Sequence, residues 1–213
     1  MGRADGRGPS PFAELFIPMT RTLNLLTVCG SLRQGSFNRM VANTLPDLAP
    51  DGVSIVEAPS IGDLPLYNAD IQNADGFPAA VTALGEAIRA ADGVVFVSPE
   101  YNFSVPGVLK NALDWVSRLP DQPFKGKPIA LQSAATGMLG GARAQYHMRQ
   151  IMVFLEALVF TKPEIFVSFA KDKVDPQTGR LVDEATRTMI ASQLDGFAQF
   201  VARVGPAQTG EQR

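Results

Sequence analysis

The sequence predicts a three-layer α/β fold, in which a five-stranded parallel sheet lies between two layers of helices. From Leu23 onward, short apolar runs alternate with longer amphipathic stretches, which is the order expected of strand–helix units. The run Val94–Val97 is apolar without alternation, as in a strand that is buried on both faces. A length of 213 residues, of which 46% are hydrophobic, indicates one domain with one filled core.

Five short, largely apolar segments are the predicted strands. In chain order they are Leu23–Cys29, Val53–Glu57, Val94–Ser98, Ile129–Ser133 and Glu164–Ser168. We expect the spatial order 2-1-3-4-5. In that order the first and third strands are neighbours at the point where the winding of the sheet reverses, and ligands bind there.

Five longer segments have apolar residues at helical spacing. They are Asn38–Leu48, Phe77–Ala91, Pro106–Leu119, Gly141–Leu158 and Asp183–Val204. Pro106 suits the first position of its helix, because the N–H that proline lacks has no partner there. Trp115 lies to one side of the apolar stripe of the same helix, and we predict that it anchors a subunit interface.

The domain is expected to span residues 23–204. Residues 1–22 contain Gly, Pro and Arg without periodicity and are predicted to be a flexible N-terminal extension, within which Met19 is an alternative start. Residues 205–213 are predicted to be a frayed C-terminal tail.

Composition excludes several classes of function. One cysteine and one histidine, Cys29 and His147, rule out a disulfide framework and a structural metal cage. A formal charge of -2 disfavours nucleic acid as a partner, and no G-x-S-x-G elbow of a hydrolase is present. Since no apolar run is long enough for a membrane span and no signal peptide is evident, we expect a cytoplasmic protein.

The loop after the first strand has the composition of a phosphate site. Two hydroxyls and a guanidinium, from Ser31, Ser36 and Arg33, lie between that strand and a helix. Free N–H groups at a helix N-terminus, hydroxyl donors and an arginine all suit an anion. The loop has neither the Lys-Ser/Thr of a Walker motif nor the glycine spacing of a dinucleotide fingerprint. An ordinary polar turn is the alternative interpretation.

Two further loops are expected at the same edge of the sheet. The loop 98–107 brings an aromatic ring and an amide, and the loop 133–141 consists mostly of small residues that let backbone approach a ring closely. Beside a phosphate site, these features suit a flat heterocycle with a polar edge. FMN has that shape.

The sequence also resembles a known family, the NAD(P)H-dependent FMN reductases of flavodoxin-like fold, and most closely the bacterial quinone and chromate reductases. The resemblance extends from about residue 23 to 204. The motifs that carry it are Gly30–Arg33 with Ser36 and Asn38, Pro99–Asn102 with Ser104, Pro106 and Gly107, Leu109–Trp115, Gly140–Arg143 and Lys173–Pro176.

The resemblance implies three groups of FMN-binding residues. The phosphate would contact Ser31, Arg33, Ser36 and Asn38, together with the backbone N–H of Phe37. The isoalloxazine ring would be lined by Pro99, Glu100, Tyr101 and Asn102, with Ser133 and Ala135 contributing from the third loop. A carboxylate opposes the negative charge of reduced flavin, so we expect Glu100 to act through its backbone or in a subunit contact.

The expected activity is transfer of a hydride from NADPH or NADH, followed by reduction of a quinone or a similar acceptor such as chromate, free flavin or an azo compound, in a ping-pong cycle. The resemblance also implies a homodimer or homotetramer. The first alternative is a flavodoxin-type electron carrier without direct NAD(P)H oxidation, which the nearly neutral charge disfavours. The second is a nucleotide-binding or scaffold protein of the same fold. We expect Cys29 to be a core residue and His147 to have no catalytic role.

Overall fold

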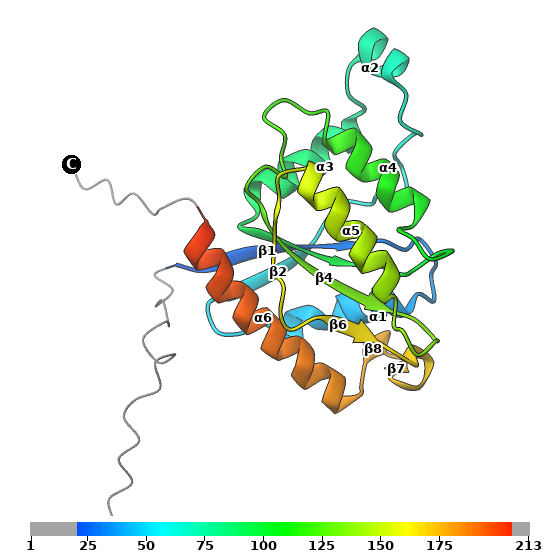
Figure 1. Cartoon of the computed structure of the whole chain (residues 1–213), viewed down its shortest axis with the longest axis vertical. Helices are drawn as coiled ribbons and strands as arrows, with labels where there is room; N and C mark the ends of the chain where they lie inside the picture. Colours follow the sequence, from blue (N-terminus) through cyan, green and yellow to red (C-terminus); the bar gives the residue numbers. More distant parts are fainter. Residues whose placement is uncertain (1–20, 206–213) are drawn as a thin grey trace, which may run out of the picture.

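The computed structural model describes residues 21–205. The predicted extension and tail lie, except for residues 21, 22 and 205, outside the described residues. Within the described chain, the predicted α/β architecture is confirmed (Figure 1).

The central sheet has the predicted parallel order, β2-β1-β3-β4-β5. The strands are β1 (Leu23–Cys29), β2 (Val53–Glu57), β3 (Gly93–Val97), β4 (Pro128–Ala134) and β5 (Leu158–Val159). The predicted fifth strand, Glu164–Ser168, is β6 (Ile165–Val167), which also pairs with β4. Cys29 at the end of β1 is in register with Val97 at the end of β3, so the loops that follow these two strands leave the sheet side by side.

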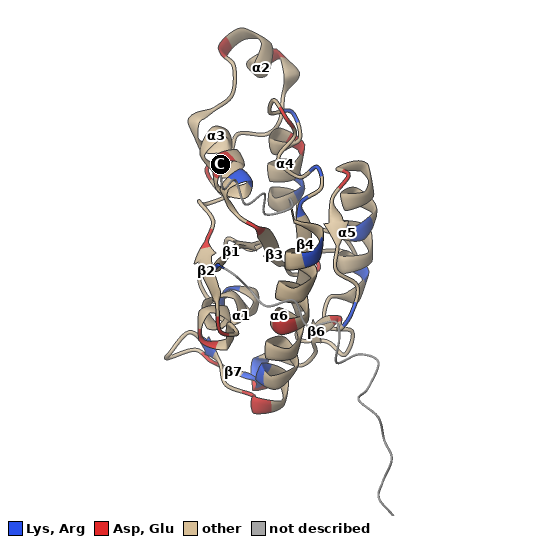
Figure 2. Ribbon diagram, turned by 90° about the vertical axis from the view of Figure 1, so that its left-hand side faces the viewer, with Lys and Arg blue, Asp and Glu red and all other residues tan. Residues whose placement is uncertain are grey.

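Helices cover both faces of the sheet (Figure 2). On one face lie α1 (Phe37–Thr44) and α6 (Glu184–Val204), and on the other lie α3 (Ala79–Ala90), α4 (Gly107–Val116) and α5 (Ala142–Phe154). Along β1, Leu25 packs in the core beneath α1 and α6, and Leu26 packs in the core beneath α3, α4 and α5. Successive side chains of a strand point to opposite faces of the sheet. Each face therefore has its own hydrophobic core.

Several predicted boundaries differ from the structure. The helix predicted over 38–48 is α1 followed by a short 3-10 helix, η2 (Leu45–Leu48), with Pro46 in its first turn, because proline has no N–H for an α-helical bond. The helix predicted to reach Leu158 ends at Phe154, and the chain turns at Glu156 with φ 54°. The last residue of that predicted helix, Leu158, instead begins β5 (Leu158–Val159), so the sheet has an additional short strand.

Besides β5, two regions of the fold were not predicted from the sequence. One is α2 (Ala69–Asp75), which has no buried residue and projects from the helices α3 and α4 (Figure 1). The other is a small hairpin of β7 (Val174–Asp175) and β8 (Arg180–Leu181), and a second 3-10 helix, η3 (Ala170–Asp172), precedes it. An exposed helix and strands of two residues leave no apolar periodicity to detect.

The prediction that Trp115 anchors a subunit interface is wrong. Its side chain is fully buried within the chain, its indole Nε1–H donates to the Pro65 carbonyl at 2.8 Å, and its ring meets Tyr67 edge-on with centroids 5.0 Å apart. Trp115 instead fastens the segment before α2 to α4. The sequence could not reveal this, since the partners lie about fifty positions away in the chain.

Candidate functional site

A cleft of about 200 Å³ lies at the edge of the sheet where β1, β3 and β4 end. It is formed by the three loops that the sequence singled out. Its lining includes every predicted site residue except Asn102 and Ser133, and adds Ala134 and Thr136; the full set is Ser31, Arg33, Ser36, Phe37, Asn38, Pro99, Glu100, Tyr101, Ala134, Ala135 and Thr136.

The two serines of the first loop are buried, and each hydroxyl accepts a hydrogen bond while keeping its own hydrogen for donation. Ser36 is the N-cap of α1, and its Oγ accepts the N–H of Arg39 at 3.4 Å. Ser31 Oγ accepts the N–H of Arg33 at 3.4 Å. Because a hydroxyl that accepts in this way still has its own hydrogen to donate, both serines can donate to a bound anion. Phe37 is the first residue of α1, so its N–H also lacks an acceptor within the helix.

Arg33 supplies positive charge at the mouth of the cleft. Its guanidinium lies 5.2 Å from the centroid of the Phe37 ring, and its side chain is exposed. None of the ion pairs among residues 21–205 involves Arg33. Its charge is thus available to a phosphate entering from solvent.

Asn38 binds the protein with its side chain. Its Nδ2 donates to the Ala134 carbonyl and its Oδ1 accepts the Ala134 N–H, both at 2.9 Å. The amide therefore ties the first loop to the end of β4. The backbone N–H of Asn38, in the first turn of α1, remains as a donor toward a phosphate, as does the second hydrogen of Nδ2.

Ser133 is also engaged internally. Its Oγ donates to the Gly140 carbonyl at 2.6 Å and accepts Nε2 of Gln145 at 2.8 Å, and the residue is 1% exposed. It holds the third loop together and does not line the cleft. Ala135 lines the cleft, while its backbone N–H and C=O bond to Val167 and Ala170, so it offers a small apolar surface.

The second loop brings an aromatic side chain to the cleft. Pro99, Glu100 and Tyr101 line it, and Tyr101 is 47% exposed. Asn102 lies one residue further, in a tight turn with φ 51°, and its side chain is outside the lining. An exposed ring beside small residues suits a flat heterocycle.

Glu100 contacts helix α5, a role that the sequence did not indicate. Its Oε2 accepts the backbone N–H of Ala144 at 3.2 Å, and Oε1 lies 3.5 Å from a guanidinium nitrogen of Arg143. Both partners are in the first turn of α5. The carboxylate is thus bound to a helix N-terminus.

Cys29 is the buried core residue that the sequence predicted. Burial raises the pKa of its thiol and outweighs the lowering effect of a hydrogen bond with the Ser31 backbone, so the thiol stays protonated near neutral pH. His147 is exposed, and its Nδ1 lies 3.0 Å from Oγ of Ser104.

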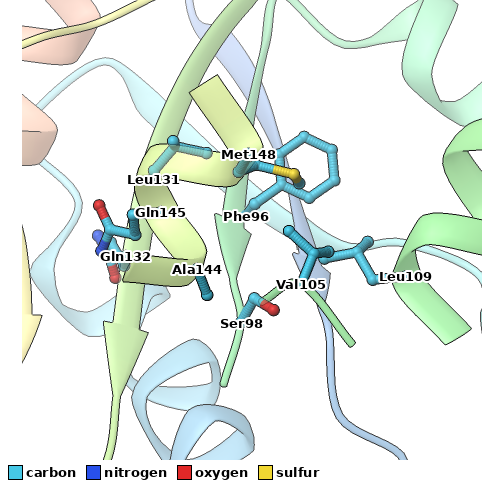
Figure 3. Close-up of a pocket in the computed structure, with 9 residues that line it drawn as sticks. All are labelled: Phe96, Ser98, Val105, Leu109, Leu131, Gln132, Ala144, Gln145 and Met148. Carbon is cyan, nitrogen blue, oxygen red and sulfur yellow. The ribbon is translucent and has the colours of Figure 1, made fainter. Parts of the chain in front are cut away.

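A small cavity lies behind the second loop (Figure 3). Its volume of about 10 Å³ is room for about one water molecule. Figure 3 shows Phe96, Met148, Val105 and Leu109 around it. It is too small and too apolar to hold a cofactor.

A third hollow, of about 370 Å³, lies beside α1 and is lined by Thr27, Ala42, Asn43, Pro46, Ile55, Val56, Glu57, Thr178 and Arg180. Its charged side chains already have partners. Glu57 pairs with Arg39, and Arg180 pairs with Asp47. The cleft at Ser31–Asn38 is therefore the better candidate for an anionic ligand.

The residues of that cleft fit FMN. One end gathers hydroxyls, helix N-terminal N–H groups and an arginine, as a phosphate requires. The other end joins an exposed tyrosine to small side chains at Ala134 and Ala135, as a flat ring requires. No group of three or more His, Cys, Asp or Glu within residues 21–205 could hold a metal ion, and no helix there is long and apolar enough to cross a membrane.

The fold and the cleft are those of a flavodoxin-like reductase. The family model "NADPH-dependent FMN reductase" matches residues 23–172, and the chain belongs to this family. The resemblance inferred from the loop motifs is thereby confirmed.

Individual relatives agree. A quinone reductase of Escherichia coli is 56% identical over 186 residues, which are 87% of this chain and 99% of the relative. An NAD(P)H-dependent FMN reductase of Pseudomonas aeruginosa is 47% identical over 186 residues, with the same coverage. Among solved structures, FerB, a flavoenzyme NAD(P)H:(acceptor) oxidoreductase of Paracoccus denitrificans, superimposes with a TM-score of 0.78 at 30% identity, covering 87% of this chain and 100% of that one.

Proposed function

We propose that this protein binds FMN in the cleft at the ends of β1, β3 and β4, takes a hydride from NADPH or NADH, and reduces quinones. The observation that carries the proposal is the cleft itself, where an unpaired arginine and buried hydroxyl donors lie beside a tyrosine and small residues. The quinone reductase of Escherichia coli, 56% identical, supports a quinone as acceptor.

The phosphate of FMN would be held by the hydroxyls of Ser31 and Ser36, the guanidinium of Arg33, and the N–H groups of Phe37 and Asn38. Asn38 positions this loop through its amide bonds to Ala134. The Asn38 amide and the Ser133 hydroxyl are hydrogen-bonded within the protein, so Asn38 would contribute its backbone N–H, and Ser133 would hold the third loop without contacting FMN. The ring would lie along Pro99–Tyr101 and the small residues 134–136.

Bound FMN would supply the redox chemistry, accepting two electrons as a hydride from the nicotinamide and delivering two electrons, with protons from solvent, to the quinone. The protein binds and orients the reactants, and no side chain needs to act as a nucleophile. The cleft is open beside the exposed Tyr101 and Phe103, so both substrates can use one opening in turn. We therefore expect parallel lines in initial-velocity plots.

Chromate, free flavin and azo compounds are further candidate acceptors. We favour NADPH over NADH, because the exposed side chain of Arg143 near the cleft can bind the extra phosphate. We also propose a cytoplasmic homodimer or homotetramer. A monomeric mass in light scattering at micromolar concentration would reject the assembly.

The first test is the visible spectrum of the protein after incubation with FMN and desalting, followed by one anaerobic addition of NADPH and then a benzoquinone. Retained flavin that bleaches with NADPH and recovers its colour with the quinone supports the proposal. Retained flavin that NADPH does not bleach indicates an electron carrier. Absence of bleaching, even with excess free FMN present, would reject the reductase and favour a scaffold of the same fold.

A further inference from the structure

The second cleft loop ends in a tight hairpin over residues 101–104. Tyr101 and Ser104 exchange two backbone hydrogen bonds, each of 3.0 Å. The two residues between them, Asn102 and Phe103, have φ values of 51° and 66°. A turn with two left-handed residues prefers glycine at the second position, and phenylalanine is strained there. Contacts outside the hairpin must therefore hold it in place.

Three such contacts come from the first two turns of α5. Before the hairpin, the carboxylate of Glu100 accepts the N–H of Ala144 at 3.2 Å. At its tip, the guanidinium of Arg143 lies 4.0 Å from the centroid of the Phe103 ring. At its end, Oγ of Ser104 lies 3.0 Å from Nδ1 of His147. One helix thus grips the hairpin at three points.

Glu100 is the central contact because it supplies an acidic side chain to a helix end that has no side-chain cap of its own. Gly141, the N-cap of α5, has no side chain to bond the first-turn N–H groups, and no acidic residue lies in that turn. The Glu100 carboxylate, 13% exposed, takes this role from another loop. A negative charge is favoured at a helix N-terminus, and the bond to Ala144 is charge-assisted.

We propose that Glu100 is a positioning residue that holds the 101–104 hairpin, and with it the cleft-lining Tyr101, against the N-terminus of α5. Its consequence for cofactor binding rests on the proposed FMN function. The side chain acts through its reach and its acceptor oxygen. The negative charge strengthens this bond but is not required for it.

Hydrogen exchange of the hairpin amides in the FMN-free full-length protein tests the contact directly. Glu100→Ala should speed exchange in the segment 101–104 about tenfold, because the hairpin opens locally more often. Glu100→Asp keeps the charge but is one methylene too short to reach Ala144, and should behave like Glu100→Ala. Glu100→Gln keeps the reach and an acceptor oxygen, and should stay within about threefold of the wild type.

The matched control is Asp183→Ala. Asp183 caps α6, where its Oδ1 accepts the N–H of Thr186 at 2.9 Å, far from the cleft in sequence. The Asp183→Ala substitution removes a comparable helix cap, so the melting temperature should fall while hydrogen exchange of the amides at 101–104 stays unchanged. If Glu100→Ala exchanges like the wild type, or if Glu100→Asp stays protected while Glu100→Gln does not, the proposal is wrong.

FMN affinity, measured by quenching of flavin fluorescence, gives the functional consequence. The dissociation constant should rise about tenfold in Glu100→Ala and Glu100→Asp and stay close to the wild type in Glu100→Gln. An unchanged constant in the first two variants would overturn the positioning role. If the wild type binds no FMN, the proposed function fails, while the exchange result still decides whether Glu100 holds the hairpin.

Discussion

Asn38 offers the sharpest test of how the phosphate loop is held. The ladder between β3 and β4 ends with Val97 opposite Gln132, and two residues later the Asn38 amide bonds both backbone groups of Ala134 at 2.9 Å. The amide takes the place of a strand residue that β3 no longer supplies. The side chain is 3% exposed, so water cannot readily replace it.

Asn38→Ala should destabilise the FMN-free protein. Two buried backbone groups lose their partner at about 1–3 kcal/mol each, which gives a loss of about 2–6 kcal/mol in the free energy of unfolding. For a domain of this size the melting temperature should fall by about 4–24 °C. Thermal unfolding followed by circular dichroism, without cofactor, measures this directly.

Asn43→Ala is the matched control on the same helix. Asn43 is half-buried and makes one side-chain bond, of 3.3 Å, to the Gly179 carbonyl. Its removal should cost only about 0.5–1.5 kcal/mol. If Asn38→Ala melts like the wild type without FMN and loses only FMN affinity, Asn38 is a direct phosphate ligand and the structural reasoning is refuted.

Three further outcomes are expected. Burial raises the pKa of the Asp92 carboxyl, but hydrogen bonds from Arg21 and the Asn24 N–H, together with the charges of Arg21 and Lys127, outweigh burial and lower it. The ionised carboxylate therefore stabilises the folded protein above the unfolded pKa of about 3.9. This stabilisation is lost as pH falls through the lower pKa of the folded state. The melting temperatures of wild type and Asp92→Asn should accordingly converge below about pH 4, and a constant gap would contradict this. Trp115→Phe should lose about 0.5–1.5 kcal/mol, because the Pro65 carbonyl loses the indole N–H but keeps its hydrogen bond from Asn111 Nδ2. Light scattering should show no change of mass; a smaller assembly would restore the interface role. Gly141→Ala should lower the free energy of unfolding by about 1–3 kcal/mol, because φ is 91° and the new Cβ would lie 2.7 Å from Cβ of Ser133. The control is Gly137→Ala, whose new Cβ has no atom within 4 Å, and its melting temperature should stay within about 1 °C of the wild type.

Most of the sheet was predictable because its strands are short, largely apolar segments, and β1, β3 and β4 are buried almost throughout. The bounds of β1 and β2 match the predicted ranges, and β3 differs by one residue at each end. The C-terminal half was less accurate, since the apolar segment after α5 suits a helix and a strand equally well. There the ladder to β4 decides, as Pro128 and Ile129 pair with Leu158 and Val159.

The location of the cleft was predictable, but the use of its side chains was not. Strand order alone brings the three loops to one edge. Whether Asn38 and Ser133 face a ligand or the protein depends on partners such as Ala134 and Gly140. Those partners follow from tertiary packing, which no local pattern encodes. The same reason hid Trp115, whose offset from the apolar stripe reflects a protruding segment that covers it.

The position of Glu100 answers a difficulty that the sequence raises. A carboxylate within a site for an anionic cofactor should weaken binding. In the structure its oxygens face the Ala144 N–H and the Arg143 guanidinium, so its charge is largely balanced by a helix N-terminus and a cation. Arg33 has no carboxylate partner in the described chain, so its positive charge at the phosphate end remains available to an anion. An acidic residue can thus remain in the cleft wall because it serves the fold of that wall.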